Sequence, residues 1–272
     1  MDIDGITSEL SIEDLIILAC RGGWPDSLKV KNEKAKLLIA KDYVNKVCDD
    51  DISRIDNIKR NPELTRLILR SYARNLCTLA KKSAILNDVN AEMSVVSQVT
   101  FDDYVDALKR LYVLEDIDAW CPAIRSASAI RVGKKRCFID PSIAIAAMGA
   151  SPKILELDLK TFGFLFETLC VRDLRVFADA LNGDVYHYRD KDGQECDAVI
   201  HLRNGQYGLV EIKLGGDKLI EEGASSLKSM EMKLDTDKMN APSFLMVLTG
   251  TGDYAYRRQD GVYVIPIGCL KN

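Results

Sequence analysis

Two short segments of the chain carry the residue types that phosphodiester chemistry requires. Asp197 lies in one strand-like run, and Glu211 and Lys213 lie in the next, after a glycine-containing turn. Ionisable groups on an otherwise apolar sheet are costly to desolvate unless they bind a metal or pair with each other. Two facing carboxylates can ligate Mg²⁺ through oxygen, and a neighbouring lysine can stabilise the charge on a phosphorane or steer a water molecule. The pattern therefore predicts a metal-dependent phosphodiesterase site, with Asp197 and Glu211 as the metal ligands.

The turn decides whether Asp197 shares a face with the other two residues. A two-residue turn puts Asp197 on the wrong face of the hairpin. A three-residue loop that ends at a left-handed Gly205 sets Leu202 opposite Gln206, and Asp197 then faces Glu211. Only this second register gives a continuous apolar face, made of Cys196, Ala198, Ile200, Val210 and Ile212. We therefore predict the three-residue loop.

A long helix, expected over residues 159–181, supplies a fourth group. Glu167 lies on the apolar stripe of this helix, which also carries Phe164, Val171, Leu174 and Ala178. An acid on the core-facing side of a helix needs a cation or a metal as its partner. We expect Glu167 to orient waters on the metal. The alternative for the hairpin is simple charge pairing, with Glu195 opposite Lys213 and no catalysis.

The remaining elements predict an α+β chain with two regions. Residues 1–150 are expected to be helical, with helices at 12–21, 32–47, from 62 onward, 87–97 and 100–111, and strands at 112–114 and 136–139. Short helices followed by a two-stranded wing resemble a winged helix-turn-helix. Residues 151–272 are expected to form an α/β domain with a mixed sheet. Its strands are predicted near 185–189, 195–202, 206–214, 244–249, 254–257 and 262–267, and its second helix near 218–234.

Nucleic acid contacts must come from local features, because the net charge is −4 and the pI is about 5.4. The second helix of the winged-helix-like region exposes three aspartates against Lys109 and Arg110, and acidic groups repel phosphates, so a packing role is favoured over DNA reading. One basic patch, residues 125–136, is free of acids; it contains Arg125, Arg131, Lys134, Lys135 and Arg136. This patch and the carboxylate cleft are the expected contacts for nucleic acid.

Several classes of function are excluded by what the sequence lacks. No phosphate-binding loop of the G-x-x-x-x-G-K-[ST] type occurs, so no ATP site and no ATPase activity are expected from this chain alone. No apolar run approaches the length of a membrane span, and no signal peptide is recognisable, so we expect a cytoplasmic protein without a membrane partner. The eight cysteines are widely spaced, which favours buried thiols over disulfides or a zinc site.

Several segments resemble known families. The segments Phe162–Glu167, Tyr188–Asp197 and Glu211–Lys213 resemble the PD-(D/E)xK nuclease superfamily. More closely, they resemble the C-terminal domain of unknown function of prokaryotic AAA-type P-loop ATPases. The resemblance extends to the first half of the chain, through Arg21–Pro25, the segment from Tyr43 to Arg54, and Phe138–Pro141.

The resemblance implies a restriction-endonuclease-like fold in residues 151–272, with Glu167, Asp197, Glu211 and Lys213 at the superfamily's four active positions. It also implies an ATPase domain, which this sequence lacks. Two functions stay open: a Mg²⁺-dependent endonuclease acting on DNA or RNA, and a catalytically inactive nuclease-like module that docks an ATPase domain or a partner protein.

Overall fold

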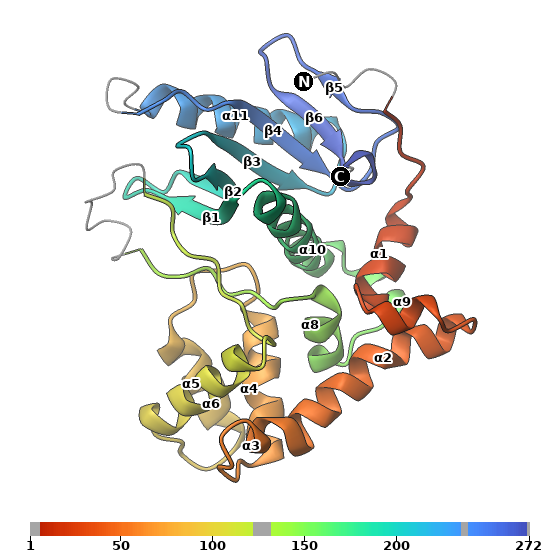
Figure 1. Ribbon diagram of the computed structural model, residues 1–272, viewed down its shortest axis with the longest axis vertical. Helices are drawn as coiled ribbons and strands as arrows, with labels where there is room; N and C mark the ends of the chain where they lie inside the picture. Colours follow the sequence, from red (N-terminus) through yellow and green to blue (C-terminus); the bar gives the residue numbers. More distant parts are fainter. Residues whose placement is uncertain (1–5, 122–131, 235–238, 271–272) are drawn as a thin grey trace. The chain divides into compact units, whose positions relative to one another are not determined.

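The computed structural model describes residues 6–121, 132–234 and 239–270, which divide into two compact units (Figure 1). The helical unit comprises residues 16–116 and 135–168, and the sheet unit comprises residues 1–15, 117–134 and 169–272. Each unit therefore contains segments that are distant in sequence. The expected fold class is confirmed: a helical N-terminal region is followed by a mixed α/β sheet, so the chain is α+β overall.

The helices of the first half are α1 (Ile12–Arg21), α2 (Glu33–Lys46), α3 (Ile52–Arg54), α4 (Pro62–Arg74), α5 (Lys82–Glu92) and α6 (Gln98–Arg110). The helices α8 (Pro141–Met148), α9 (Pro152–Leu157) and α10 (Leu159–Ala180) follow. Side-chain caps fix several of these starts. Asn32 accepts hydrogen bonds from the first turn of α2, and Asn61 does so ahead of Pro62 in α4. Ser11 and Asp14 cap each other's backbone amides at the start of α1, as their spacing predicts.

A buried ionic cluster joins elements within the helical unit. The Asp116 carboxylate accepts hydrogen bonds from the Tyr72 hydroxyl at 2.6 Å, from Arg136 at 2.7 Å and from Lys109 at 2.8 Å. The Tyr72 ring also packs edge-on against Phe138. Because a buried carboxylate is stable only when it is paired, this cluster fixes the segment from residue 135 against α4 and α6.

Two expectations for this region were wrong in detail. The helix expected at 87–97 is α5, at Lys82–Glu92; its N-cap residue, Lys81, forms no side-chain cap, so the sequence carries no start signal there. The two expected wing strands reduce, among the described residues, to one isolated bridge between Leu114 and Phe138. The winged-helix resemblance therefore rests on the helices rather than on a formed wing.

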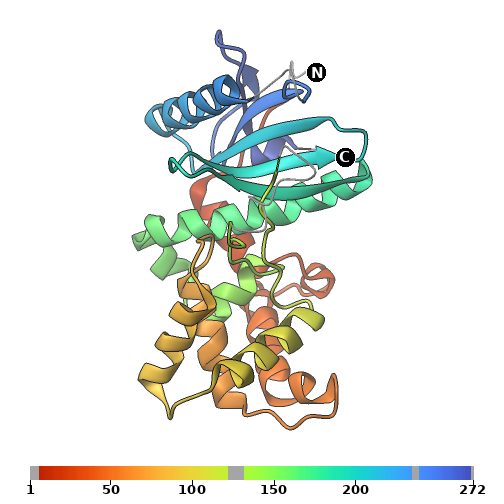
Figure 2. The ribbon, with the colours of Figure 1, turned by 90° about the vertical axis from the view of Figure 1, so that its left-hand side faces the viewer.

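The sheet unit is built on a six-stranded sheet in the order β1-β2-β3-β4-β6-β5. The strands are β1 (Gly183–Arg189), β2 (Glu195–Leu202), β3 (Tyr207–Lys213), β4 (Phe244–Thr249), β5 (Tyr256–Arg257) and β6 (Tyr263–Pro266). Strand β3 runs antiparallel to β2 and parallel to β4, and β4 runs parallel to β6. The helix α11 (Asp217–Lys233) provides the connection between β3 and β4. It lies along one face of the sheet (Figures 1 and 2).

Both edges of the sheet carry an additional bridge. Ala119 bridges His187 in parallel on β1, where the Trp120 amide donates to the His187 carbonyl oxygen at 2.6 Å. Thr7 bridges Tyr254 ahead of β5. These short segments satisfy backbone groups that an edge strand would otherwise leave open.

The predicted register of the β2–β3 hairpin is confirmed. Ala198 pairs with Val210 and His201 pairs with Tyr207, and the Leu202 amide donates to the carbonyl oxygen of Gln206 at 2.8 Å. Gly205 has φ = 85°, the left-handed conformation that the three-residue loop requires. The expected apolar face is buried, apart from the intermediate exposure of Ile200. This register puts Asp197, Glu211 and Lys213 on one face of the sheet.

All eight cysteines are free thiols, and seven of them are buried, as their spacing predicts. Burial raises the pKa of the Cys48 thiol to about 11, which makes it a packing group rather than a nucleophile. Among the described residues, no helix is long and apolar enough to cross a bilayer.

Candidate functional site

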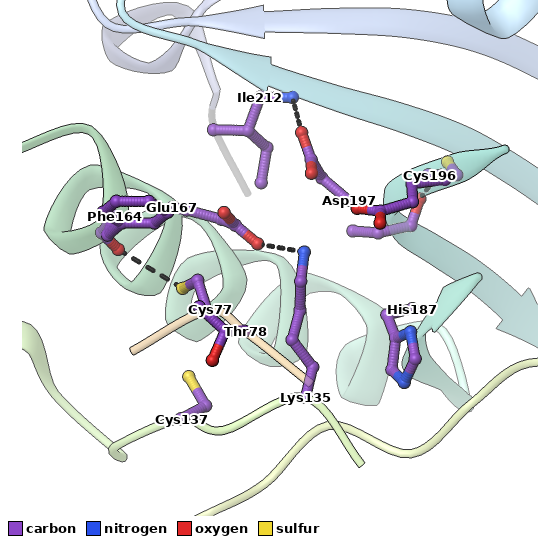
Figure 3. A network of polar contacts seen from close by, with 12 residues as sticks. Cys77, Thr78, Lys135, Cys137, Phe164, Glu167, His187, Cys196, Asp197 and Ile212 are labelled. Carbon is purple, nitrogen blue, oxygen red and sulfur yellow. Dashed lines mark hydrogen bonds and ion pairs between the residues drawn. The ribbon is translucent and has the colours of Figure 1, made fainter. Parts of the chain in front are cut away.

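Asp197, Glu211 and Lys213 meet where β2 begins and β3 ends. The Lys213 ammonium nitrogen lies 2.6 Å from Glu211 Oε2 and 3.5 Å from Asp197 Oδ2. Asp197 Oδ2 also accepts a hydrogen bond from the Ile212 amide at 2.9 Å, which ties the carboxylate to the neighbouring strand (Figure 3). Glu195, by contrast, pairs with Arg189, so the alternative pairing of Glu195 with Lys213 is not the one formed.

Glu211 is the most buried of the three, at 5% exposure. Burial and the nearby Asp197 carboxylate raise the pKa of Glu211 to about 7, while Lys213 and the Ser226 hydroxyl oppose the rise. A carboxyl group that titrates near neutrality beside a second acid and a lysine is a common property of functional sites.

The three residues line a cavity of about 510 Å³ in the sheet unit. The other lining residues come from the β1–β2 loop, from the start of β2 and from α11: Asp192, Gly193, Gln194, Glu195, Glu222, Ser226 and Lys233. Every lining side chain is polar or charged, glycine aside, and five carboxylates face two lysines. A surplus of acids attracts cations and repels bare phosphate.

Two polar residues at the cavity were not identified from the sequence. Ser226 on α11 donates a hydrogen bond to Glu211 Oε1 at 3.2 Å, and Gln194 in the β1–β2 loop donates to Ser226 Oγ at 3.1 Å. One signal was present: Ala224, Leu227 and Met230 give α11 a core-facing stripe, and Ser226 lies next to that stripe. A polar residue beside a buried stripe needs a partner on the facing strand.

Glu167 lies in the helical unit, in α10. Its carboxylate forms an ion pair with Lys135, and both side chains are largely buried (Figure 3). The acid on the apolar side of this helix therefore has a cationic partner, as its burial demands. Phe164, expected on the same core-facing stripe, is instead 40% exposed. The role of Glu167 beside a metal stays a prediction.

The charges on α6 are engaged inside the helical unit. Asp102 pairs with Lys82 at 2.6 Å, and Asp103 pairs with Arg60 at 3.1 Å. The basic residues Lys109 and Arg110 pair with Asp116 and Asp56. These pairs agree with the packing role that the sequence favours for this helix.

The basic patch at 125–136 is described only in part, because Arg125 and Arg131 lie outside the described residues. Of its other members, Lys134 pairs with Asp118, Lys135 with Glu167, and Arg136 with Asp116. Each of these three cations has a carboxylate partner. A role of the patch in binding nucleic acid stays a prediction.

The two histidines of the chain lie in the sheet unit. The ring of His187 is buried, and its Nε2 lies 3.1 Å from the Gly133 carbonyl oxygen. His201 packs edge-on against Trp120, and burial lowers its pKa. Both occupy strand positions, His187 in β1 and His201 in β2.

The mixed sheet, its acidic cavity and the helical N-terminal region define a two-part chain, and each part matches a different domain of unknown function. Residues 12–154 match the domain of unknown function DUF8612, which covers more than half of the chain, so the chain belongs to this family. Residues 162–270 match the domain of unknown function DUF4143, a domain known in AAA-ATPase-associated contexts. No curated protein and no solved structure matches the chain. The predicted domain division at residue 150 stays a prediction.

Proposed function

We propose that the sheet unit carries a Mg²⁺-dependent site for phosphodiester hydrolysis, in the C-terminal part of an AAA-type ATPase-family protein. The observation that supports it is the arrangement of Asp197, Glu211 and Lys213 on one face, in a cavity where carboxylates outnumber lysines. The match of residues 162–270 to a domain known in ATPase-associated contexts supports the ATPase link. The PD-(D/E)xK resemblance supports the type of chemistry.

The donor set fits a hard cation. Asp197 and Glu211 offer carboxylate oxygens, and Mg²⁺ typically takes one or two protein carboxylates and completes its shell with water and phosphate oxygens. Among the described residues there is no group of three or more histidine, cysteine, aspartate or glutamate side chains that could hold a metal. This fits a two-carboxylate magnesium site better than a site for zinc. The bound ion would polarise a phosphoryl oxygen and lower the pKa of a water ligand.

Each protein group then has a separate task. Asp197, held by the Ile212 amide, and Glu211, held by Ser226, present their oxygens to the cation. Lys213 donates hydrogen bonds to a phosphate oxygen in the transition state. Glu167 is the fourth proposed position, where it orients waters. The proposal takes nucleic acid as the substrate, with the carboxylate cavity and the basic patch at 125–136 as the two expected contacts.

The test is cleavage of supercoiled plasmid, single-stranded DNA and RNA by the full chain with Mg²⁺ or Mn²⁺. We expect Asp197→Ala and Lys213→Ala each to lower the cleavage rate by at least about 100-fold, because each removes a group that acts on the metal or on the developing charge. Glu221→Gln is the matched control, since it removes one exposed carboxylate of α11 that is not among the residues lining the cavity. Equal cleavage by the wild type and by Asp197→Ala would contradict the proposal.

One observation favours a second function. The Lys213 ammonium group contacts both carboxylates without any metal, which is the arrangement expected of a catalytically inactive module that docks an ATPase domain or a partner protein. The same assay separates the two. A wild-type chain that neither cleaves any substrate nor binds Mn²⁺ would favour the interaction module.

A further inference from the structure

A chain of hydrogen bonds leads from the body of α11 to the Glu211 carboxylate. The Ser229 hydroxyl donates to Gln194 Oε1 at 3.1 Å, and Gln194 Nε2 donates to Ser226 Oγ at 3.1 Å. Ser226 in turn donates to Glu211 Oε1 at 3.2 Å. All four residues belong to the sheet unit, and three of them line the cavity.

The direction of this chain is fixed by the donors available. A carboxylate only accepts, so the single hydroxyl proton of Ser226 goes to Glu211. The Ser226 oxygen then accepts a hydrogen bond, which the Gln194 NH₂ donates. The same NH₂ also donates to the Ser226 carbonyl oxygen at 3.3 Å. Ser229 holds the oxygen end of the Gln194 amide, which prevents the amide from flipping.

Glu211 is thereby held at both oxygens by different elements. Lys213 bonds Oε2 from the same strand, and Ser226 bonds Oε1 from α11. An approaching cation competes with Lys213 for Oε2, whereas the Ser226 contact leaves the carboxylate oriented. The β1–β2 loop is also tied to α11 by an ion pair at 3.5 Å between Lys233 and Asp190, so Gln194 sits on a fastened segment.

We infer that Ser226 and Gln194 are positioning residues for the metal-binding carboxylate of Glu211, and that they set the affinity of the cavity for a divalent cation. The inference rests on the proposed metal site, and it names residues that the resemblance does not supply. Removal of a group that hydrogen-bonds to a metal ligand and orients it typically lowers metal affinity or activity by about 10–100-fold.

The test measures Mn²⁺ binding to the full chain by the loss of the electron paramagnetic resonance signal of free Mn²⁺. We expect Ser226→Ala to weaken binding by about 10–100-fold, and Ser226→Thr, which keeps the hydroxyl, to restore most of the affinity. Ser225→Ala is the matched control, because Ser225 is the adjacent, exposed serine of the same helix. It should leave the affinity unchanged.

A second variant separates positioning from simple electrostatics. Gln194→Glu has nearly the same shape but cannot donate to Ser226, and its carboxylate competes with Glu211 for the Ser226 proton. If cavity charge alone sets affinity, this added acid strengthens Mn²⁺ binding. The positioning role predicts the opposite: weaker binding. Circular dichroism confirms that each variant is folded, and Gln194→Glu decides the question if Ser226→Ala does not fold.

The outcomes distinguish the positioning role of Ser226 and Gln194 from the existence of the metal site itself. A wild-type chain that binds Mn²⁺, together with a Ser226→Ala chain that binds it equally well or a Gln194→Glu chain that binds it more tightly, overturns the positioning role and leaves the metal site standing. A wild-type chain that does not bind Mn²⁺ at millimolar concentration overturns both.

Discussion

Burial and the Asp197 carboxylate raise the pKa of Glu211 to about 7, so this side chain changes charge near neutral pH. In the unfolded chain its pKa falls back to about 4.5. Between these two values the folded state binds more protons than the unfolded state. Stability must therefore fall as pH rises from about 4.5 to 7, because the ionised form is the one that burial disfavours.

The fall in stability with rising pH predicts that Glu211→Gln stabilises the chain at high pH. The variant carries no charge to bury, so its free energy of unfolding should exceed that of the wild type at pH 8 by up to about 3 kcal/mol, because each unit of the rise from 4.5 to about 7 corresponds to about 1.4 kcal/mol. The gain should vanish below pH 4.5, where the wild-type carboxyl is also neutral in both states. Urea unfolding of both chains at pH 4.5, 6 and 8 measures this difference in the free energy of unfolding.

Added Mg²⁺ provides a second test of the buried Glu211 charge. If the cation binds Glu211, it stabilises the wild type at pH 8 and not the Glu211→Gln variant. A constant difference between the two chains from pH 4.5 to 8 would contradict the raised pKa.

At the residue scale, most of the candidate site could be predicted from the sequence. The apolar residues of the two strands favour the register that buries Cys196 and Ala198, and Gly205 supplies the left-handed loop residue for it. Asp197 and Glu211 follow from that register. The pairing of Glu195 could not be settled in this way, because it depends on Arg189 across the β1–β2 strand pair.

At the scale of elements, the close approach of α11 to β3 is what brings Ser226 to Glu211. Gly223 makes this approach possible: a Cβ atom there would lie 3.4 Å from Glu211 Cβ and 3.3 Å from a methyl group of Val247. Such contacts are tighter than ordinary packing, and the Glu211 Cβ is fixed to the strand backbone.

Gly223→Ala should therefore move α11 away from the strand by a few tenths of an ångström. The higher helix propensity of alanine contributes about 1 kcal/mol, which offsets most of the packing cost, so we expect the free energy of unfolding to change by less than about 1 kcal/mol. The Ser226 contact lengthens, and Mn²⁺ affinity should fall by about 3–10-fold by analogy with other lost outer contacts of metal ligands.

The matched control is Ser225→Ala, an alanine substitution two residues away on the exposed side of the same helix. Unchanged Mn²⁺ affinity in Gly223→Ala would show that the helix spacing does not govern the site.

The stripe of Ala224, Leu227 and Met230 predicts which side of α11 faces the sheet, but not the finer rotation that decides the partner of Ser226. Rotation is decided by which side chains of the sheet it meets, such as Val199, Leu209 and Val247 in the shared core. The sequence pattern of α11 alone does not contain those contacts. Ser226 and Gln194 were missed for this reason.

At the scale of the whole molecule, the sheet unit includes residues that lie in the first half of the chain. Trp120 is buried among Tyr188, His201 and Tyr207, with its ring centroid 5.0 Å from that of Tyr207. No periodic pattern links residue 120 to strands that begin at residue 183. The sequence division at residue 150 therefore could not foresee that this tryptophan belongs to the sheet.

A fragment of residues 155–272, which contains the whole match to the second domain, should fold poorly. It lacks Trp120 and the bridge at Ala119, so aromatic rings and part of the edge of β1 are exposed. In the full chain, Trp120→Ala should cost about 3–5 kcal/mol of stability. Circular dichroism during urea unfolding measures both, with Trp24→Ala as the control in the helical unit.

A fragment that unfolds cooperatively at the same urea concentration as the sheet unit of the full chain would contradict this expectation.

The two bridges at the sheet edges also set an order of events during protein synthesis. Thr7 emerges from the ribosome long before Tyr254, and Ala119 before His187, yet each pair must meet. Helices α4 and α5 pack on each other and are neighbours in sequence, so they can form while the chain is still growing, whereas the contacts of α2 and α4 with α8 form later. The segments around Thr7 and Trp120 must wait, with apolar side chains exposed, until the later strands are made. Slowing translation of the second half lengthens that wait, so this chain should depend on chaperones more than its size suggests.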